Sequence, residues 1–264
     1  MKYNLFIFTL ILLTLTGCGA IQSAPLAVSK QPQFWSFAEE RFGHCRERPV
    51  VYRKLPALSR SFLGQVAKID AFLVPEAPTA PDYATSSPML KSLLAKCSAC
   101  NDYERAELYT RLAFLEYAQN NTSNAIDAYL VVLSIKNSIP VRREQETLYT
   151  VAQLFAGEDD YSKAKSYFAQ WEETCPTEEK QDYFYRLAQI NYQLKDYTES
   201  MKNLDIELEM LKFNGRFIPT TRKRLKLALE LELYGEMKSL EYAKELGWHN
   251  KPKKDSKENE QYKK

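Results

Sequence analysis

The sequence predicts an all-α protein, an α-solenoid of stacked antiparallel helix pairs. Eight glycines in 264 residues are few, and glycine is the residue that turns, hairpins and bulges use most. Long stretches rich in leucine, alanine, glutamate, lysine and tyrosine favour helix over sheet. The third observation is an internal repeat, because helix pairs that recur along the chain stack on one another to bury their apolar faces.

Composition and charge exclude several classes of protein. Hydrophobic residues make up 45% of the chain and charged residues 27%, as expected for a packed, soluble core. The formal net charge of +2 gives no overall attraction to nucleic acid. Only two histidines occur, His44 and His249, and histidine is the commonest acid–base residue near neutral pH. Neither a Ser/His/Asp set nor a glycine-rich phosphate loop can be built, so we expect no enzymatic activity and no cofactor.

The N-terminus has the pattern of a signal segment. Lys2 precedes an apolar run over residues 5–15, which is about the length of a signal core and shorter than the ~20 residues of a membrane-spanning helix. The tetrapeptide Leu-Thr-Gly-Cys at residues 15–18 resembles the lipobox of bacterial lipoproteins. This resemblance implies that residues 1–17 are removed and that Cys18 becomes a lipidated N-terminus in the periplasm. The alternatives are a plain signal peptide and a buried N-terminal helix.

The residue that follows Cys18 bears on which membrane holds the anchor. An aspartate there resembles an inner-membrane retention signal, whereas this chain has Gly19, so the resemblance favours the periplasmic face of the outer membrane. Two or more acyl chains anchor a protein stably where one chain does not. Residues 18–31 are rich in alanine, serine, glutamine and proline, and we expect them to form a flexible tether.

Residues 32–74 form a predicted N-terminal helical segment. One helical pattern covers residues 34–46, and a second covers residues 58–72, where apolar residues recur three or four positions apart. A linker is predicted at residues 75–88, because prolines punctuate it. These prolines are Pro75, Pro78, Pro81 and Pro88. Residues 89–247 then read as almost unbroken helix and form the predicted repeat domain.

The last residues, 248–264, differ in composition from the rest of the chain. They are basic and contain few apolar residues, so we expect a disordered tail. Such a tail could contact anionic lipid or peptidoglycan, but a solvated tail is the simpler interpretation.

Within the repeat domain, four units share one spacing. Each unit has an apolar residue followed by alanine: Leu112-Ala113, Val151-Ala152, Leu187-Ala188 and Leu227-Ala228. Twelve residues after each alanine comes a small or apolar residue: Ala125, Ala164, Ser200 and Leu240. Turn-like residues lie between the two positions. Antiparallel helices approach closely only where small side chains meet, so the sequence predicts that these positions pack at helix crossings.

These residues resemble the tetratricopeptide repeat family, whose unit is about 34 residues long. The second unit matches best, over Leu148 to Pro176, while the fourth is degenerate. The matching residues of the second unit are Ala152, Phe155, Tyr161, Ala164, Phe168 and Pro176. Over residues 106–247 the resemblance implies a right-handed superhelix with peptide-binding surfaces. A general helical-hairpin protein is the alternative.

A second resemblance concerns residues 103–197. They are similar to repeat proteins that accompany TonB energy-transduction systems. The segments concerned are Tyr103–Leu108, Ala125–Tyr129, Ile139-Pro140 and Thr147–Phe155, together with Trp171. The resemblance implies an accessory of TonB-dependent outer-membrane transport, with TonB-system components as possible partners.

Four cysteines remain besides Cys18, and an even number in an oxidising compartment suggests disulfides. They are Cys45, Cys97, Cys100 and Cys175, which allow three complete pairings. Free or packed thiols are one alternative. A metal or redox site at Cys97 and Cys100 is another, in which His44 and Cys45 would complete four zinc ligands. We expect structural disulfides and no metal.

The first helix of each unit is expected to line a partner-binding groove. The repeat spacing places tyrosine and glutamine at matching positions of the second and third units, and these side chains suit peptide recognition. The predicted groove residues are Tyr117, Tyr149, Gln153, Tyr185, Gln189 and Tyr192. The alternative is that Tyr149 and Tyr185 pack between units, and for Phe114 core packing is favoured.

The sequence therefore predicts a lipid-anchored periplasmic scaffold that binds a protein or peptide, and no nucleic acid. An accessory of TonB-dependent transport is the first hypothesis. An assembly or pilotin-type outer-membrane lipoprotein is the second. A thiol-redox or metal-dependent enzyme at Cys97 and Cys100 is the third.

Overall fold

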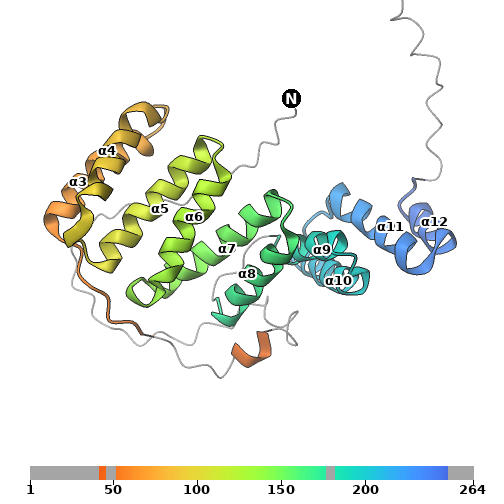
Figure 1. Cartoon of the computed structure of the whole chain (residues 1–264). Helices are drawn as coiled ribbons and strands as arrows, with labels where there is room; N and C mark the ends of the chain where they lie inside the picture. Colours follow the sequence, from red (N-terminus) through yellow and green to blue (C-terminus); the bar gives the residue numbers. More distant parts are fainter. Residues whose placement is uncertain (1–41, 46–51, 177–181, 249–264) are drawn as a thin grey trace, which may run out of the picture. The chain divides into compact units, whose positions relative to one another are not determined.

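The computed structural model describes residues 42–45, 52–176 and 182–248 (Figure 1). Within these ranges the regular secondary structure is helical, with ten α-helices and three short 3-10 helices. The α-helices are α3 (Arg60–Leu73), α4 (Tyr83–Ala95), α5 (Asp102–Ala118), α6 (Thr122–Ser134), α7 (Val141–Gly157), α8 (Tyr161–Glu173), α9 (Tyr183–Gln193), α10 (Tyr197–Phe213), α11 (Thr220–Tyr234) and α12 (Glu236–Glu245). The 3-10 helices are η1 (Gly43–Cys45), η2 (Cys97–Ala99) and η3 (Lys136–Ser138). The predicted all-α class is confirmed for the described residues, while the predicted signal peptide, the tether from Cys18 and nearly all of the tail lie outside them.

Neighbouring helices pack in pairs along the chain. The pairs α3/α4, α5/α6, α7/α8, α9/α10 and α11/α12 form successive antiparallel hairpins, which follow one another from orange to blue in Figure 1. The second helix of each hairpin also contacts the first helix of the next hairpin. This arrangement is compatible with an α-solenoid.

The alanine spacing seen in the sequence corresponds to helix contacts in three hairpins. Full burial is shared by Ala113, Ala125, Ala152, Ala164, Ala188 and Ser200. In the α9/α10 hairpin the Ser200 hydroxyl donates a hydrogen bond of 2.6 Å to the Ala188 carbonyl, so positions twelve residues apart do meet. The α11/α12 hairpin differs, because Ala228 is half-buried and Leu240 is exposed.

The same spacing extends to the turn of each hairpin. A residue with positive φ lies seven positions after each alanine: Asn120 (63°), Asp159 (60°), Lys195 (62°) and Gly235 (82°). At the first three turns the next N–H donates to a carbonyl five residues back, in the bonds Asn121–Glu116, Asp160–Phe155 and Asp196–Asn191. This is the Schellman pattern that ends helices. The repeat therefore fixes the backbone of the turns as well as the packing of the helices.

Residues 75–88 do not form a continuous linker. Helix α4 begins at Tyr83 and includes Pro88, so the predicted linker is wrong beyond residue 82. The Asp82 side chain caps this helix by accepting a 3.0 Å hydrogen bond from the backbone N–H of Thr85. Pro88 lies in the second turn, where its ring is exposed.

The predicted boundary between the N-terminal segment and the repeat domain is also not observed. Helices α3, α4 and α5 share one core cluster, to which Val66, Leu90 and Leu108 belong. Because these helices bury their apolar side chains together, α3 and α4 form another hairpin of the same stack. The second helical pattern of the N-terminal segment is confirmed as α3.

Residues 42–45 belong to a different part of the core. Phe42 is fully buried, and its ring centroid lies 6.2 Å from that of Trp171 and 6.3 Å from that of Tyr183. Cys45 forms a disulfide with Cys175, 130 residues away. This short segment therefore packs against the end of α8 and the start of α9. Most of the helical pattern predicted for residues 34–46 lies outside the described residues.

We predict that Ala152→Leu destabilises the protein by about 1–3 kcal/mol, because added methylene groups overpack a fully buried helix crossing. Ala169→Leu is the matched control, since Ala169 is exposed on α8. Urea unfolding of both variants measures the difference. Equal stability of the two would contradict the packing role of Ala152.

Candidate partner-binding face

The six predicted groove residues all lie on the first helices of the hairpins, α5, α7 and α9. Tyr117 is 40% exposed and Gln189 is exposed, whereas Gln153, Tyr185 and Tyr192 are half-buried. Tyr149 is only 7% exposed. The structure therefore places five of the six where at least part of the side chain reaches solvent.

Tyr149 is a core residue, and its assignment to the groove is wrong. Its ring centroid lies 5.2 Å from that of Phe168, 5.2 Å from that of Trp171 and 6.2 Å from that of Tyr183. Burial raises the pKa of its hydroxyl, and the nearby Arg186 guanidinium opposes part of that shift. The alternative that Tyr149 packs between units is the correct one.

Tyr185 has the same position in its unit but a different surrounding. The Arg222 guanidinium of α11 lies over its ring, 3.8 Å from the centroid. Arg222 also pairs with Asp182 at the start of α9 and lies 3.3 Å from the Glu207 carboxylate of α10. Tyr185 is thus part of a polar cluster in which three helices meet. Tyr192 packs on Tyr197, with 5.5 Å between ring centroids.

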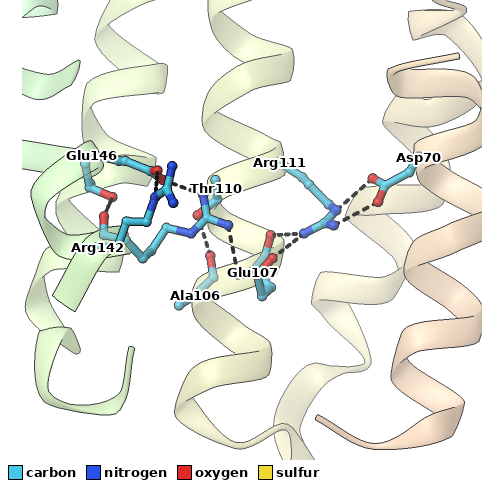
Figure 2. A network of polar contacts seen from close by, with 9 residues as sticks. Asp70, Ala106, Glu107, Thr110, Arg111, Arg142 and Glu146 are labelled. Atoms are coloured by element: carbon cyan, nitrogen blue, oxygen red, sulfur yellow. Dashed lines mark hydrogen bonds and ion pairs between the residues drawn. The ribbon is translucent and has the colours of Figure 1, made fainter. Parts of the chain in front are cut away.

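A row of ion pairs connects α3, α5 and α7. Figure 2 shows Arg111 of α5 between two carboxylates. Its Nε and Nη2 atoms each lie 2.8 Å from an oxygen of Asp70 on α3, and its Nη1 atom lies 2.8 Å from Glu107. Glu107 also accepts a 3.3 Å hydrogen bond from Arg143 of α7, which in turn pairs with Glu146 at 3.4 Å. We call these five residues the ion-pair ladder.

The strength of these pairs differs along the ladder. Burial alone would lower the pKa of the Arg111 guanidinium, but the hydrogen bonds and charges of Asp70 and then Glu107 raise it above its usual value. Bidentate arginine–carboxylate contacts fix orientation as well as energy. Between α5 and α7, Arg143 donates a single 3.3 Å hydrogen bond to Glu107 and is 34% exposed, and exposed pairs contribute little to stability. The ladder therefore sets the relative orientation of α3 and α5 more strongly than that of α5 and α7.

The sequence interpretation missed these charged residues, although the repeat spacing could have revealed them. Counting back six and two positions from each alanine gives Glu107/Arg111, Glu146/Thr150, Asp182/Arg186 and Arg222/Lys226. Seven of these eight residues are charged, so the spacing that identified the alanines also marks a polar row on the first helices. Gln153 and Gln189 follow one position after the alanine. The first helices therefore carry a charged row in addition to the predicted tyrosine and amide residues.

The four cysteines form two disulfides, Cys45–Cys175 and Cys97–Cys100. The two bonds pack against different core clusters, so the four zinc ligands considered from the sequence are not brought together. His44 lies beside the first bond, with 3.4 Å between its Nε2 atom and Cys45 Sγ. His44, Cys45 and Cys175 are close enough to share a metal ion, but a disulfide offers no thiolate ligand.

Comparison of the chain with protein-family models, with curated proteins and with solved structures found no match. In the part of the chain that the structure describes, none of the helices combines the length and the hydropathy needed to cross a membrane. Function is therefore inferred from the residues of the first helices and from the N-terminal sequence.

Proposed function

We propose that the chain is a lipid-anchored periplasmic scaffold that binds a protein or peptide partner, as an accessory of TonB-dependent outer-membrane transport. The observation that supports it most is the polar row on the first helices. Gln153, Gln189 and Tyr117 offer donors and acceptors on the same helices as side chains held by ion pairs, such as Arg111 of α5, Glu146 of α7 and Asp182 at the start of α9.

Fixed side chains favour recognition of an extended polypeptide. A side chain that is already ordered loses little rotamer freedom on binding, so more of the contact energy remains as affinity. Amide groups can hydrogen-bond to the backbone of a partner without regard to its charge. Stacked helical repeats characteristically present such residues along an extended surface.

The two more specific parts of the proposal depend on sequence resemblance. The anchor depends on the lipobox-like tetrapeptide that ends at Cys18, and the TonB system depends on residues 103–197. A right-handed superhelix of tetratricopeptide type is likewise proposed, on the alanine spacing and the pairing of neighbouring helices.

A photo-crosslinking side chain placed at Gln189 should capture a TonB-system component in living cells, identified by mass spectrometry. Gln170 is the matched control, because it is an exposed glutamine on the second helix α8. A partner captured equally from both positions, or from neither, would contradict recognition by the first helices. A captured protein unrelated to TonB would keep the scaffold and reject the transport role.

The same cells test the anchor independently. Labelling with an alkyne analogue of palmitate should mark the chain, and Cys18→Ser should abolish the label. A chain that is labelled after this substitution would refute lipidation at Cys18.

A further inference from the structure

The α10–α11 region has an unusual charge distribution. Residues 210–229 include six basic side chains and no acidic one, in a chain whose formal net charge is only +2. The basic residues are Lys212, Arg216, Arg222, Lys223, Arg224 and Lys226. The nearest acidic residues in the sequence are Glu209 and Glu230, which flank the stretch.

Two of these six cations have structural roles. Arg222 pairs with Asp182 and Glu207, and Lys226 lies 3.1 Å from Asp205. Lys212, Arg216 and Arg224 are exposed, and Lys223 is half-buried. The outer part of the region therefore presents a basic surface that the structural ion pairs do not neutralise.

Two large rings stand out from the same region. Phe213 is 59% exposed and Phe217 is 77% exposed. The Lys223 ammonium lies 5.2 Å from the centroid of the Phe217 ring, so this ring and a cation of the region are adjacent. Exposing a phenylalanine to water is unfavourable, and a ring held among basic side chains indicates a surface that covers it.

The backbone holds this loop in a defined conformation. Gly215 ends α10 with φ of 62°, a left-handed conformation that favours glycine. The Arg216 N–H then donates a 2.8 Å hydrogen bond to the Leu211 carbonyl, which closes the turn. Little ordering is therefore needed before the loop can bind.

We propose that residues 212–224, the basic aromatic loop, bind anionic lipid headgroups at a membrane surface. Basic side chains attract anionic headgroups, and aromatic rings are favoured at the depth of the headgroups. An acidic peptide would satisfy the cations, whereas an anionic membrane surface satisfies the cations and also offers the acyl boundary to the exposed ring. This contact is separate from the anchor proposed at Cys18 and does not depend on it.

Fluorescence of a tryptophan placed at position 217 of the full chain, measured in the presence of vesicles, tests this proposal. The F217W variant should be quenched by brominated phosphatidylglycerol, and much less by vesicles of brominated phosphatidylcholine alone. M237W is the matched control, because Met237 is also exposed, at 81%, but lies on α12 outside the loop. The unsubstituted chain gives the background of the three native tryptophans. Equal quenching at both positions, or no dependence on the anionic lipid, would overturn the proposal.

The charge requirement is tested in the F217W background. Arg216→Gln with Arg224→Gln should weaken the anionic-lipid response by on the order of tenfold. Lys91→Gln with Lys96→Gln removes the same charge from an exposed position of α4 and from the exposed residue that caps its C-terminus, and should leave the response unchanged. Equal responses of the two double variants would refute the role of the loop. A shift of F217W emission by soluble polyglutamate, without quenching by brominated anionic lipid, would assign the loop to an acidic polypeptide instead.

Discussion

Replacing Cys45 and Cys175 together with serine should lower the free energy of unfolding by about 5 kcal/mol, because the bond closes a loop of 130 residues. In the reduced or substituted chain, the unfolded state gains the conformational freedom that this loop closure removes. The bond also holds the segment that contains Phe42 next to Trp171 and Tyr183. Urea unfolding of the double variant, monitored by circular dichroism, measures the loss.

The second disulfide gives a control within the same molecule. Cys97 and Cys100 are three residues apart, so the same reasoning gives only about 2 kcal/mol for the corresponding double serine variant. All four cysteines are half-buried, which makes the lost packing comparable. Equal destabilisation by the two double variants would show that loop closure does not explain the stabilising effect of the Cys45–Cys175 bond.

The helical stack could be predicted from the sequence because its cause is local and repeated. The small residues that pack at each helix crossing can be recognised in the sequence. They are Ala113, Ala152 and Ala188, each followed twelve residues later by the small residue that packs against it. The turn residues Asn120, Asp159 and Lys195 keep the same spacing, because the same helix end recurs. Pro88 was wrongly placed in the predicted linker. The Asp82 cap allows α4 to begin at Tyr83, so Pro88 lies inside the helix.

The exposure of each side chain was harder to predict, because it depends on the neighbouring helix. Tyr149 and Tyr185 share one position in their units, and sequence reasoning treats them alike. Phe168 and Trp171 cover Tyr149, whereas Arg222 lies over Tyr185 and leaves it half-buried. The residues of the neighbouring helices, rather than the repeat position, decide which tyrosine is available to a partner.

Contacts between segments that are far apart in the sequence could not be predicted from the repeat spacing. Asp70 completes the ion-pair ladder from α3, which lies outside the units that the alanines define. The pairing of Cys45 with Cys175 was one of three possibilities, because spacing along the chain says nothing about which cysteines meet. The burial of Phe42 could not be predicted for a similar reason, because the short segment at residues 42–45 does not belong to a repeat unit.

Trp171→Ala should cost about 3–5 kcal/mol of stability, as expected when a large aromatic side chain is deleted from a packed core. Trp171 is fully buried and contacts the rings of Phe42, Tyr149 and Tyr183, with centroid distances of 6.2, 5.2 and 4.6 Å. These rings come from the segment at residue 42, from α7 and from α9, and Trp171 itself lies on α8, so one substitution loosens four parts of the chain.

Two further variants separate this core role from a general effect of losing a tryptophan. Trp248→Ala removes a half-buried ring just after α12 and should cost much less than Trp171→Ala. Trp171→Phe keeps a ring and removes an indole N–H that has no hydrogen-bond partner among the described residues, so it should retain most of the stability. If Trp171→Ala were no more destabilising than Trp248→Ala, the aromatic cluster would not hold α7, α8 and α9 together. The face that presents Gln153 and Gln189 on two of these helices would then lack a rigid support.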